Sequence, residues 1–164
     1  MSEFKPVEAL ETLVRFGVEF VLIGGIAGRL WGSPSITGDT DVCPERSRRN
    51  LDRLALALDD LDATLRGAPD DVPFLLDSET LAGGANFTFN TAFGKLDVVG
   101  LPAGVDGYDE LVRSAVTLPL GKIDVMVCSL DDLIRMKRAA GRPKDRADLA
   151  RLEAVKAELE EEGN

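Results

Sequence analysis

The sequence predicts an α/β (α+β) fold in which a single domain spans residues 1–164. Short apolar runs with strand character alternate along the chain with amphipathic, helix-like segments, and glycine or proline residues bound most of them. A length of 164 residues is typical of one compact domain. No stretch with the composition of a linker divides the chain, so we expect one hydrophobic core.

The N-terminal part begins with apolar residues at helical spacing, which predict a helix over residues 7–16. The short apolar run at residues 19–23 predicts a buried strand. A glycine pair behind it turns the chain into a second helix over residues 26–31. Residues 36–43 predict another strand, which a proline ends, and leucines on one face predict a helix over residues 50–61.

The later part of the chain contains several strand-like runs. They cover residues 63–65, 86–90, 95–99, 115–118 and 122–127. A short helix is expected at residues 107–114. Ser129, with an acid three residues later, is a typical helix start, and Gly141 is a typical helix end. Pro143 begins the last helix, so the chain is predicted to end in a helical pair.

The composition excludes several kinds of chemistry. The chain contains no histidine, which excludes Ser-His-Asp triads and most zinc sites. Cys43 and Cys128 lie far apart in apolar surroundings and are interpreted as buried thiols. The net charge of −10 argues against a wide nucleic-acid-binding face. Because no apolar run could span a bilayer and the N-terminus lacks a signal-peptide pattern, we expect a cytoplasmic protein without a membrane partner.

Two features point to phosphate and metal chemistry. Gly24 and Gly25 stand between a strand and a helix, where glycine lets the backbone approach a phosphate, although a simple turn is the commoner meaning of such a pair. Asp39 and Asp41 lie two residues apart in a predicted strand and therefore share a face with Thr37. A divalent cation relieves the repulsion between two carboxylates, and oxygen ligands suit Mg²⁺.

A third acid, Asp97, stands in the apolar run KLDVV. A carboxylate in such a run needs either a partner or a position that faces solvent. A metal bound to Asp39 and Asp41 would be such a partner. Asp124, in the similar segment GKIDVMV, is the alternative third acid.

Together these residues resemble the signature of the DNA polymerase β-like nucleotidyltransferase superfamily. The motif LIGG at residues 22–25 is followed by thirteen residues and then by DTDV at residues 39–42. The later segments extend the resemblance over about residues 20–152, toward small bacterial nucleotidyltransferases of the abortive-infection and toxin–antitoxin type. Thr40 stands where the family has an apolar residue between the acids.

The resemblance implies a nucleotidyltransferase fold, with a curved mixed β-sheet and helices packed mainly on one side. It also implies that Gly24 and Gly25 bind phosphate and that Asp39 and Asp41 bind Mg²⁺, with Mn²⁺ as a possible substitute. Asp97 would complete a second metal site or act as the base on the acceptor hydroxyl.

The resemblance further implies roles for residues outside the metal site. Lys137 would be a catalytic basic residue on a helix and Asp145 a downstream acid of the nucleotide site, with a surface lysine and a helix-dipole acid as the alternatives. Ser33 and Thr37 would donate hydroxyl hydrogen bonds to the triphosphate, and Lys144 would bind the nucleotide. The predicted cationic wall of the site consists of Lys137, Arg138, Arg142 and Lys144.

The function implied is Mg²⁺-dependent transfer of a nucleoside monophosphate from an NTP such as ATP to an RNA end or a protein hydroxyl, in a toxin–antitoxin or phage-defence system. The alternative is an inactive relative that binds a cognate toxin or antitoxin, which the short length and acidic charge favour. Intact Asp39, Asp41 and Asp97 favour the enzyme. A structural domain with coincidental acids is the third interpretation.

Overall fold

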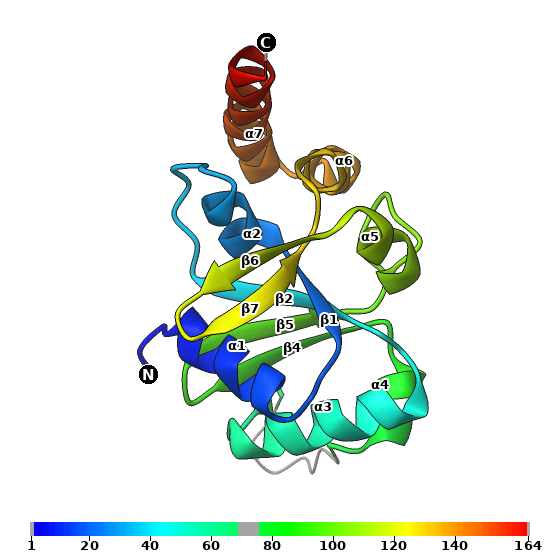
Figure 1. The fold of residues 1–164 in the computed structure, drawn as a ribbon. Helices are drawn as coiled ribbons and strands as arrows, with labels where there is room; N and C mark the ends of the chain where they lie inside the picture. The colour runs from blue at the N-terminus through cyan, green and yellow to red at the C-terminus, as the bar shows by residue number, and fades with distance from the viewer. Residues whose placement is uncertain (1, 69–75, 164) are drawn as a thin grey trace.

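The computed structural model describes residues 2–68 and 76–163, and within them seven strands form one sheet (Figure 1). The strands are β1 (Phe20–Ile23), β2 (Asp39–Pro44), β3 (Thr64–Leu65), β4 (Asn86–Thr91), β5 (Gly94–Val99), β6 (Val116–Leu120) and β7 (Ile123–Val127). Their order is β3-β4-β5-β2-β1-β7-β6. β1 runs parallel to β7 and β2 parallel to β5, whereas the other neighbours are antiparallel. The predicted mixed α/β fold is confirmed.

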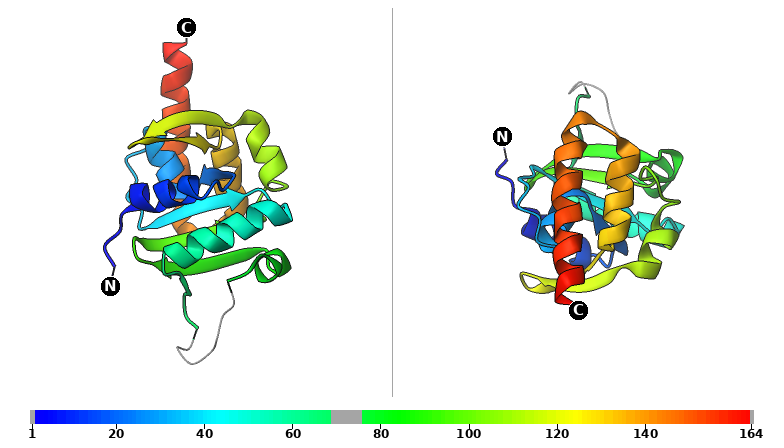
Figure 2. Two further views of the ribbon diagram at one scale, coloured as in Figure 1. Left: turned by 60° about the horizontal axis from the view of Figure 1, so that its bottom comes forward. Right: turned by 90° about the horizontal axis from the view of Figure 1, so that it is seen from above.

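The helices lie on both faces of this sheet (Figure 2), whereas the resemblance implies packing mainly on one side. They are α1 (Pro6–Arg15), α2 (Gly24–Leu30), α3 (Arg48–Asp60), α4 (Ser78–Gly83), α5 (Tyr108–Ser114), α6 (Leu130–Ala140) and α7 (Pro143–Glu162). Figure 2 shows α1 and α3 in front of the sheet, and α6 and α7 behind it and side by side. The expected C-terminal helical pair is therefore present. Of the helices described, none is both long and apolar enough to cross a membrane.

The ends of the last two helices follow from local sequence. The Ser129 hydroxyl accepts a hydrogen bond of 3.0 Å from the backbone N–H of Asp132, which caps the start of α6. Gly141 ends α6 with φ +63°, a left-handed conformation that glycine adopts without strain. Pro143 then begins α7, where its missing N–H would have had no helical partner. These three predictions are confirmed.

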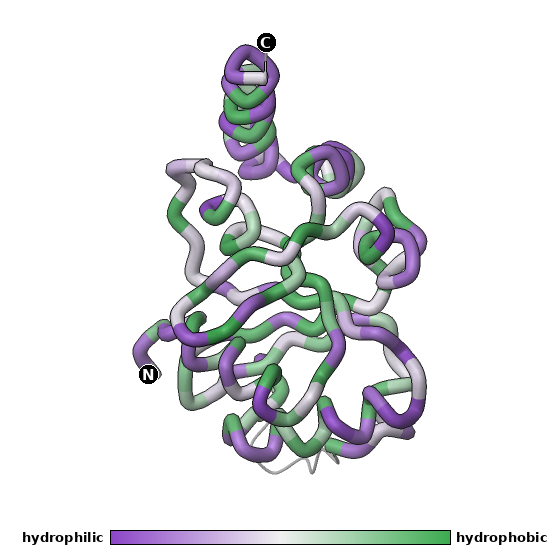
Figure 3. The backbone as a smooth tube through the Cα atoms, in the orientation of Figure 1, coloured by the Kyte–Doolittle hydropathy of each residue, from purple (hydrophilic) through white to green (hydrophobic). Residues whose placement is uncertain are grey.

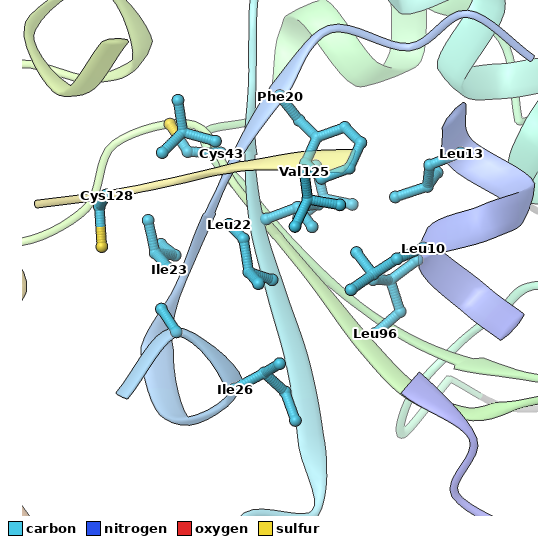
Figure 4. Close-up of a cluster of buried hydrophobic side chains, with 14 of the residues drawn as sticks. Leu10, Leu13, Phe20, Leu22, Ile23, Ile26, Cys43, Leu96, Val125 and Cys128 are labelled. Atoms are coloured by element: carbon cyan, nitrogen blue, oxygen red, sulfur yellow. The ribbon is translucent and has the colours of Figure 1, made fainter. Parts of the chain in front are cut away.

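The core is built mainly from leucine, valine, alanine and isoleucine. β1 is buried along its whole length. Figure 4 shows Leu10 and Leu13 of α1 directed toward Phe20 and Val125, which belong to the same buried cluster. Figure 3 shows hydrophobic residues concentrated where the strands cross the molecule and alternating with hydrophilic ones along α7.

The strand that carries the two acids begins later than the sequence predicts. Residues 36–38 form a loop, so the prediction that Thr37 shares a strand face with Asp39 and Asp41 is wrong. β2 acquires its partner β5 only at Asp39, which lies opposite Lys95. Thr37 instead donates its hydroxyl to the carbonyl oxygen of Asp39 at 3.2 Å, a local bond that competes with strand pairing.

Candidate active site

Three acids meet on two neighbouring strands, as predicted. Asp39 and Asp41 lie on β2, Asp97 lies on β5, and the Cα atoms of Asp41 and Asp97 are direct partners in the sheet. All three line one cavity of about 660 Å³. The alternative third acid, Asp124, is exposed on β7, which β1 separates from β2. Asp97 is therefore the third acid of this group.

The carboxyl groups of Asp41 and Asp97 are in hydrogen-bonding contact. Burial is the main cause that raises the pKa of Asp41 to about 7, and the negative charges of Asp97 and Asp39 raise it further. The positive charge of Lys137 acts in the opposite direction. Two carboxylates this close repel each other, so a nearby cation is needed to stabilise the state in which both are ionised.

These oxygens suit a hard cation such as Mg²⁺, which proteins commonly hold with one or two carboxylates together with water and substrate phosphates. Asp41 and Asp97 would supply the two carboxylates. Among the residues described, no group of three or more acidic, cysteine or histidine side chains is arranged to hold a metal. Asp39 thus lines the cavity beside the pair, without joining it as a ready third ligand.

The glycine pair follows β1 directly and forms the first two residues of α2, where the sequence predicts a turn before the helix. Gly24 has φ +73°, and a Cβ atom at this position would lie 2.2 Å from Oδ2 of Asp41. A Cβ atom at Gly25 would lie 2.6 Å from Cβ of Thr37. Both glycines line the cavity, so only residues without a side chain bring this backbone so close to the acid pair.

Lys137 lines the cavity, but its charge is already engaged. Nζ lies 3.3 Å from Oδ1 of Asp145 and 3.3 Å from Oδ2 of Asp148. Asp145 is only 2% exposed, does not line the cavity, and accepts further hydrogen bonds from the backbone N–H and Nε of Arg142 at the start of α7. Lys137 therefore also holds α6 and α7 together.

A polar chain joins this helix junction to the loop before β2. The Ser35 hydroxyl donates to Oδ1 of Asp148 at 2.9 Å, and Arg151 donates to the same oxygen at 3.2 Å. Ser33 is buried and donates its hydroxyl to Ser35 at 3.1 Å, without lining the cavity itself. The sequence interpretation missed Ser35, Asp148 and Arg151. The i, i+3 spacing of Asp145 and Asp148 on one helix was the available signal.

The cations at the cavity differ in one position from the predicted wall. Arg142 and Lys144 line the cavity as expected. Arg138 does not line it, and its guanidinium pairs with Glu153 at 2.7 Å. Arg151 takes a place in the wall instead.

No protein-family model and no curated protein matches this sequence. The crystal structure of the lincosamide antibiotic adenylyltransferase LnuA, with lincomycin bound, matches with a TM-score of 0.61 and 11% identity, over 94% of this chain and 99% of that one. The solution structure of the antibiotic-resistance factor ANT(2'')-Ia matches with a TM-score of 0.54 and 14% identity, over 95% of this chain and 91% of that one. At these identities the likeness shows the fold, and the protein has the nucleotidyltransferase fold that its sequence predicts.

Proposed function

We propose that the protein is a Mg²⁺-dependent nucleotidyltransferase that moves a nucleoside monophosphate from an NTP to an acceptor hydroxyl. One observation carries the proposal: Asp41 and Asp97 are in contact on paired strands at the cavity, with the backbone of Gly24 packed against Asp41. The nucleotidyltransferase fold supports the same reaction.

In the proposed reaction the acceptor oxygen attacks the α-phosphorus of the NTP. A new O–P bond forms, the bond from the α-phosphorus to the bridging oxygen breaks, and pyrophosphate leaves with the bonding electrons. Asp97 takes the proton of the acceptor hydroxyl. A Mg²⁺ or Mn²⁺ ion held by Asp41 and Asp97 would neutralise the charge on the phosphate oxygens.

The residues that line the opposite wall of the cavity suit the triphosphate. Lys144 is exposed, and within residues 2–68 and 76–163 no ion pair engages it. Arg142 and Arg151 line the same cavity, where they pair with Asp145 and Asp148. Lys137 is held between two carboxylates. It would therefore mainly keep α6 and α7 in place, and contribute less as a free cation.

The acceptor that we favour is a small molecule with a hydroxyl group. LnuA is described as acting on lincosamide antibiotics, and this chain spans 99% of its length. The net charge of −10 would repel RNA. RNA ends and protein hydroxyls are the other two acceptor classes. Either of them would fit a toxin–antitoxin or phage-defence role. We place the reaction in the cytoplasm, where NTPs are made.

The test is to incubate the protein with each α-labelled NTP and Mg²⁺ together with small hydroxyl compounds, RNA, or cell protein. Chromatography and gels then show which species carries the label. We expect label on a small acceptor and release of pyrophosphate. If no NTP yields label or pyrophosphate with any acceptor, the inactive relative that binds a toxin or antitoxin becomes the better account.

A further inference from the structure

Arg66 reaches the acid pair from the edge of the sheet. It directly follows β3, and its backbone N–H donates to the carbonyl oxygen of Thr88 at 2.9 Å. Thr88 is in turn the Cα partner of Asp97 across β4 and β5. The side chain of Arg66 crosses β4 along this row, and Nη2 donates to Oδ1 of Asp97 at 2.9 Å and to the carbonyl oxygen of Phe89 at 3.0 Å.

The ion pair between Arg66 and Asp97 is shielded from water. The two side chains are 27% and 17% exposed. Nε of Arg66 is buried and has no hydrogen-bond partner among the residues described. Burying this N–H without a partner destabilises the folded protein, so the ion pair is not optimised for stability alone. Arg66 does not line the cavity, so it can reach a substrate only through Asp97.

Asp97 therefore stands between a guanidinium on one side and the Asp41 carboxyl on the other. The guanidinium is itself fixed, because the same nitrogen that binds Asp97 also binds the carbonyl of Phe89. With Oδ1 tied in this way, the carboxyl group of Asp97 cannot rotate freely. Asp97 also lines the cavity, where a cation or the acceptor hydroxyl would meet its carboxyl group.

We propose that Arg66 is a positioning residue for the transfer reaction, because its hold on Oδ1 fixes the orientation of the Asp97 carboxylate. This inference rests on the proposed function. It assigns a role to a residue far from the glycine and acid motif in sequence. It also implies that the reaction depends on the orientation of the Asp97 carboxylate as well as on its negative charge.

Arg66→Met tests this role, since it removes the guanidinium and keeps the apolar stem. We expect kcat at saturating Mg²⁺ to fall roughly 10–100-fold while KM for the NTP changes little. Arg66→Lys keeps the charge and should recover part of kcat. Arg46→Met is the matched control, because Arg46 also binds backbone carbonyls, at Ala82 and Gly84, but forms no ion pair with an acid of the cavity among the residues described.

A second readout does not depend on turnover. Mn²⁺ binding, followed by electron paramagnetic resonance, should keep its affinity within about threefold in Arg66→Met, because both carboxylates remain. Recovery of full kcat at high Mg²⁺ would overturn the proposal in favour of a role in metal affinity. An unchanged kcat would overturn it too, as would a melting temperature far below that of Arg46→Met with no recovery in Arg66→Lys. If the wild type transfers no label, the proposed function itself has failed.

Discussion

Asp41 is proposed to bind the metal as a carboxylate, but its ionised form destabilises the folded protein. Its pKa is raised to about 7, first by burial and then by the charge of Asp97. The folded-state value lies above the ordinary value of 3.8, so between about pH 4 and pH 7 the folded protein binds more protons than the unfolded chain. Asp41 therefore lowers the free energy of unfolding as pH rises through this window.

Asp41→Asn is expected to stabilise the metal-free protein at pH 8, by roughly 1–3 kcal/mol, and to have little effect on stability at pH 4. Urea unfolding at both pH values measures the difference. Asp124→Asn, at an exposed position on β7, is the control and should change neither value much. Destabilisation by Asp41→Asn at pH 8 would show that the ionised Asp41 carboxylate does not reduce the free energy of unfolding.

Lys137 and Lys144 line the same cavity but should respond differently to removal. Lys137 binds the buried Asp145, so its removal should destabilise the protein as well as change the cavity. Lys137→Met should cost roughly 1–3 kcal/mol of unfolding free energy. Lys144→Met should leave stability unchanged and raise KM for the NTP.

Thermal unfolding and steady-state kinetics of both lysine variants provide this test. Lys156→Met is a control, because Lys156 pairs with Asp131 on the surface, where such a pair contributes little. Equal melting temperatures for the Lys137 and Lys144 variants would remove the structural role from Lys137. An unchanged KM in the Lys144 variant would remove Lys144 from the phosphate wall.

At the scale of elements, the turn from β1 into α2 sets the place of the acid pair. Gly24→Ala would bring a methyl group within 2.2 Å of Asp41 Oδ2 at a φ of +73°. Gly32→Ala is the matched control: its φ is +107°, but nothing lies within 4 Å of the added carbon. Both variants should lose stability through backbone strain, by about 1–2 kcal/mol or more.

Only Gly24→Ala should also displace the Asp41 carboxylate, and we therefore expect it alone to abolish most of the turnover. Kinetics at a temperature where both variants remain folded separates the clash from the strain. Equal turnover in the two variants would mean that the close approach at Gly24 has no part in the site.

The sequence predicts elements well where the signals are local. Ser129, Gly141 and Pro143 define the ends of the last two helices through contacts within a few residues. The short helix α4 was missed, although Asp77 caps it by accepting a hydrogen bond from the Thr80 N–H at 2.7 Å. The late start of β2 was not predictable from local pattern, because pairing with β5 determines it.

The site was predictable mainly where its residues stand close together in the sequence. The acids and glycines stand in a motif with a characteristic spacing, so their sequence reveals them. Arg66 carries no such signal, because its partner Asp97 lies 31 residues away along the chain. Asp148 has a spacing signal with Asp145, but its partner Ser35 lies 113 residues away. Contacts of this kind arise only when the sheet and the helical pair have formed.

For the whole molecule, the order of the strands is what turns separate acids into a site. Asp41 and Asp97 face each other because β5 lies next to β2 and runs in the same direction. The match to LnuA extends over 94% of this chain at 11% identity, so the overall arrangement is similar although few residues are shared. This arrangement supports the proposal that residues 1–164 act as one domain.

The most direct test is calorimetric titration of the wild type, Asp41→Asn and Asp124→Asn with ATP, GTP, CTP and UTP, with and without Mg²⁺. If the Asp41–Asp97 pair holds the metal that carries the nucleotide, at least one NTP binds the wild type and Asp124→Asn only when Mg²⁺ is present. Asp41→Asn then loses this binding. Binding that does not require the metal, or that persists in Asp41→Asn, would contradict the account.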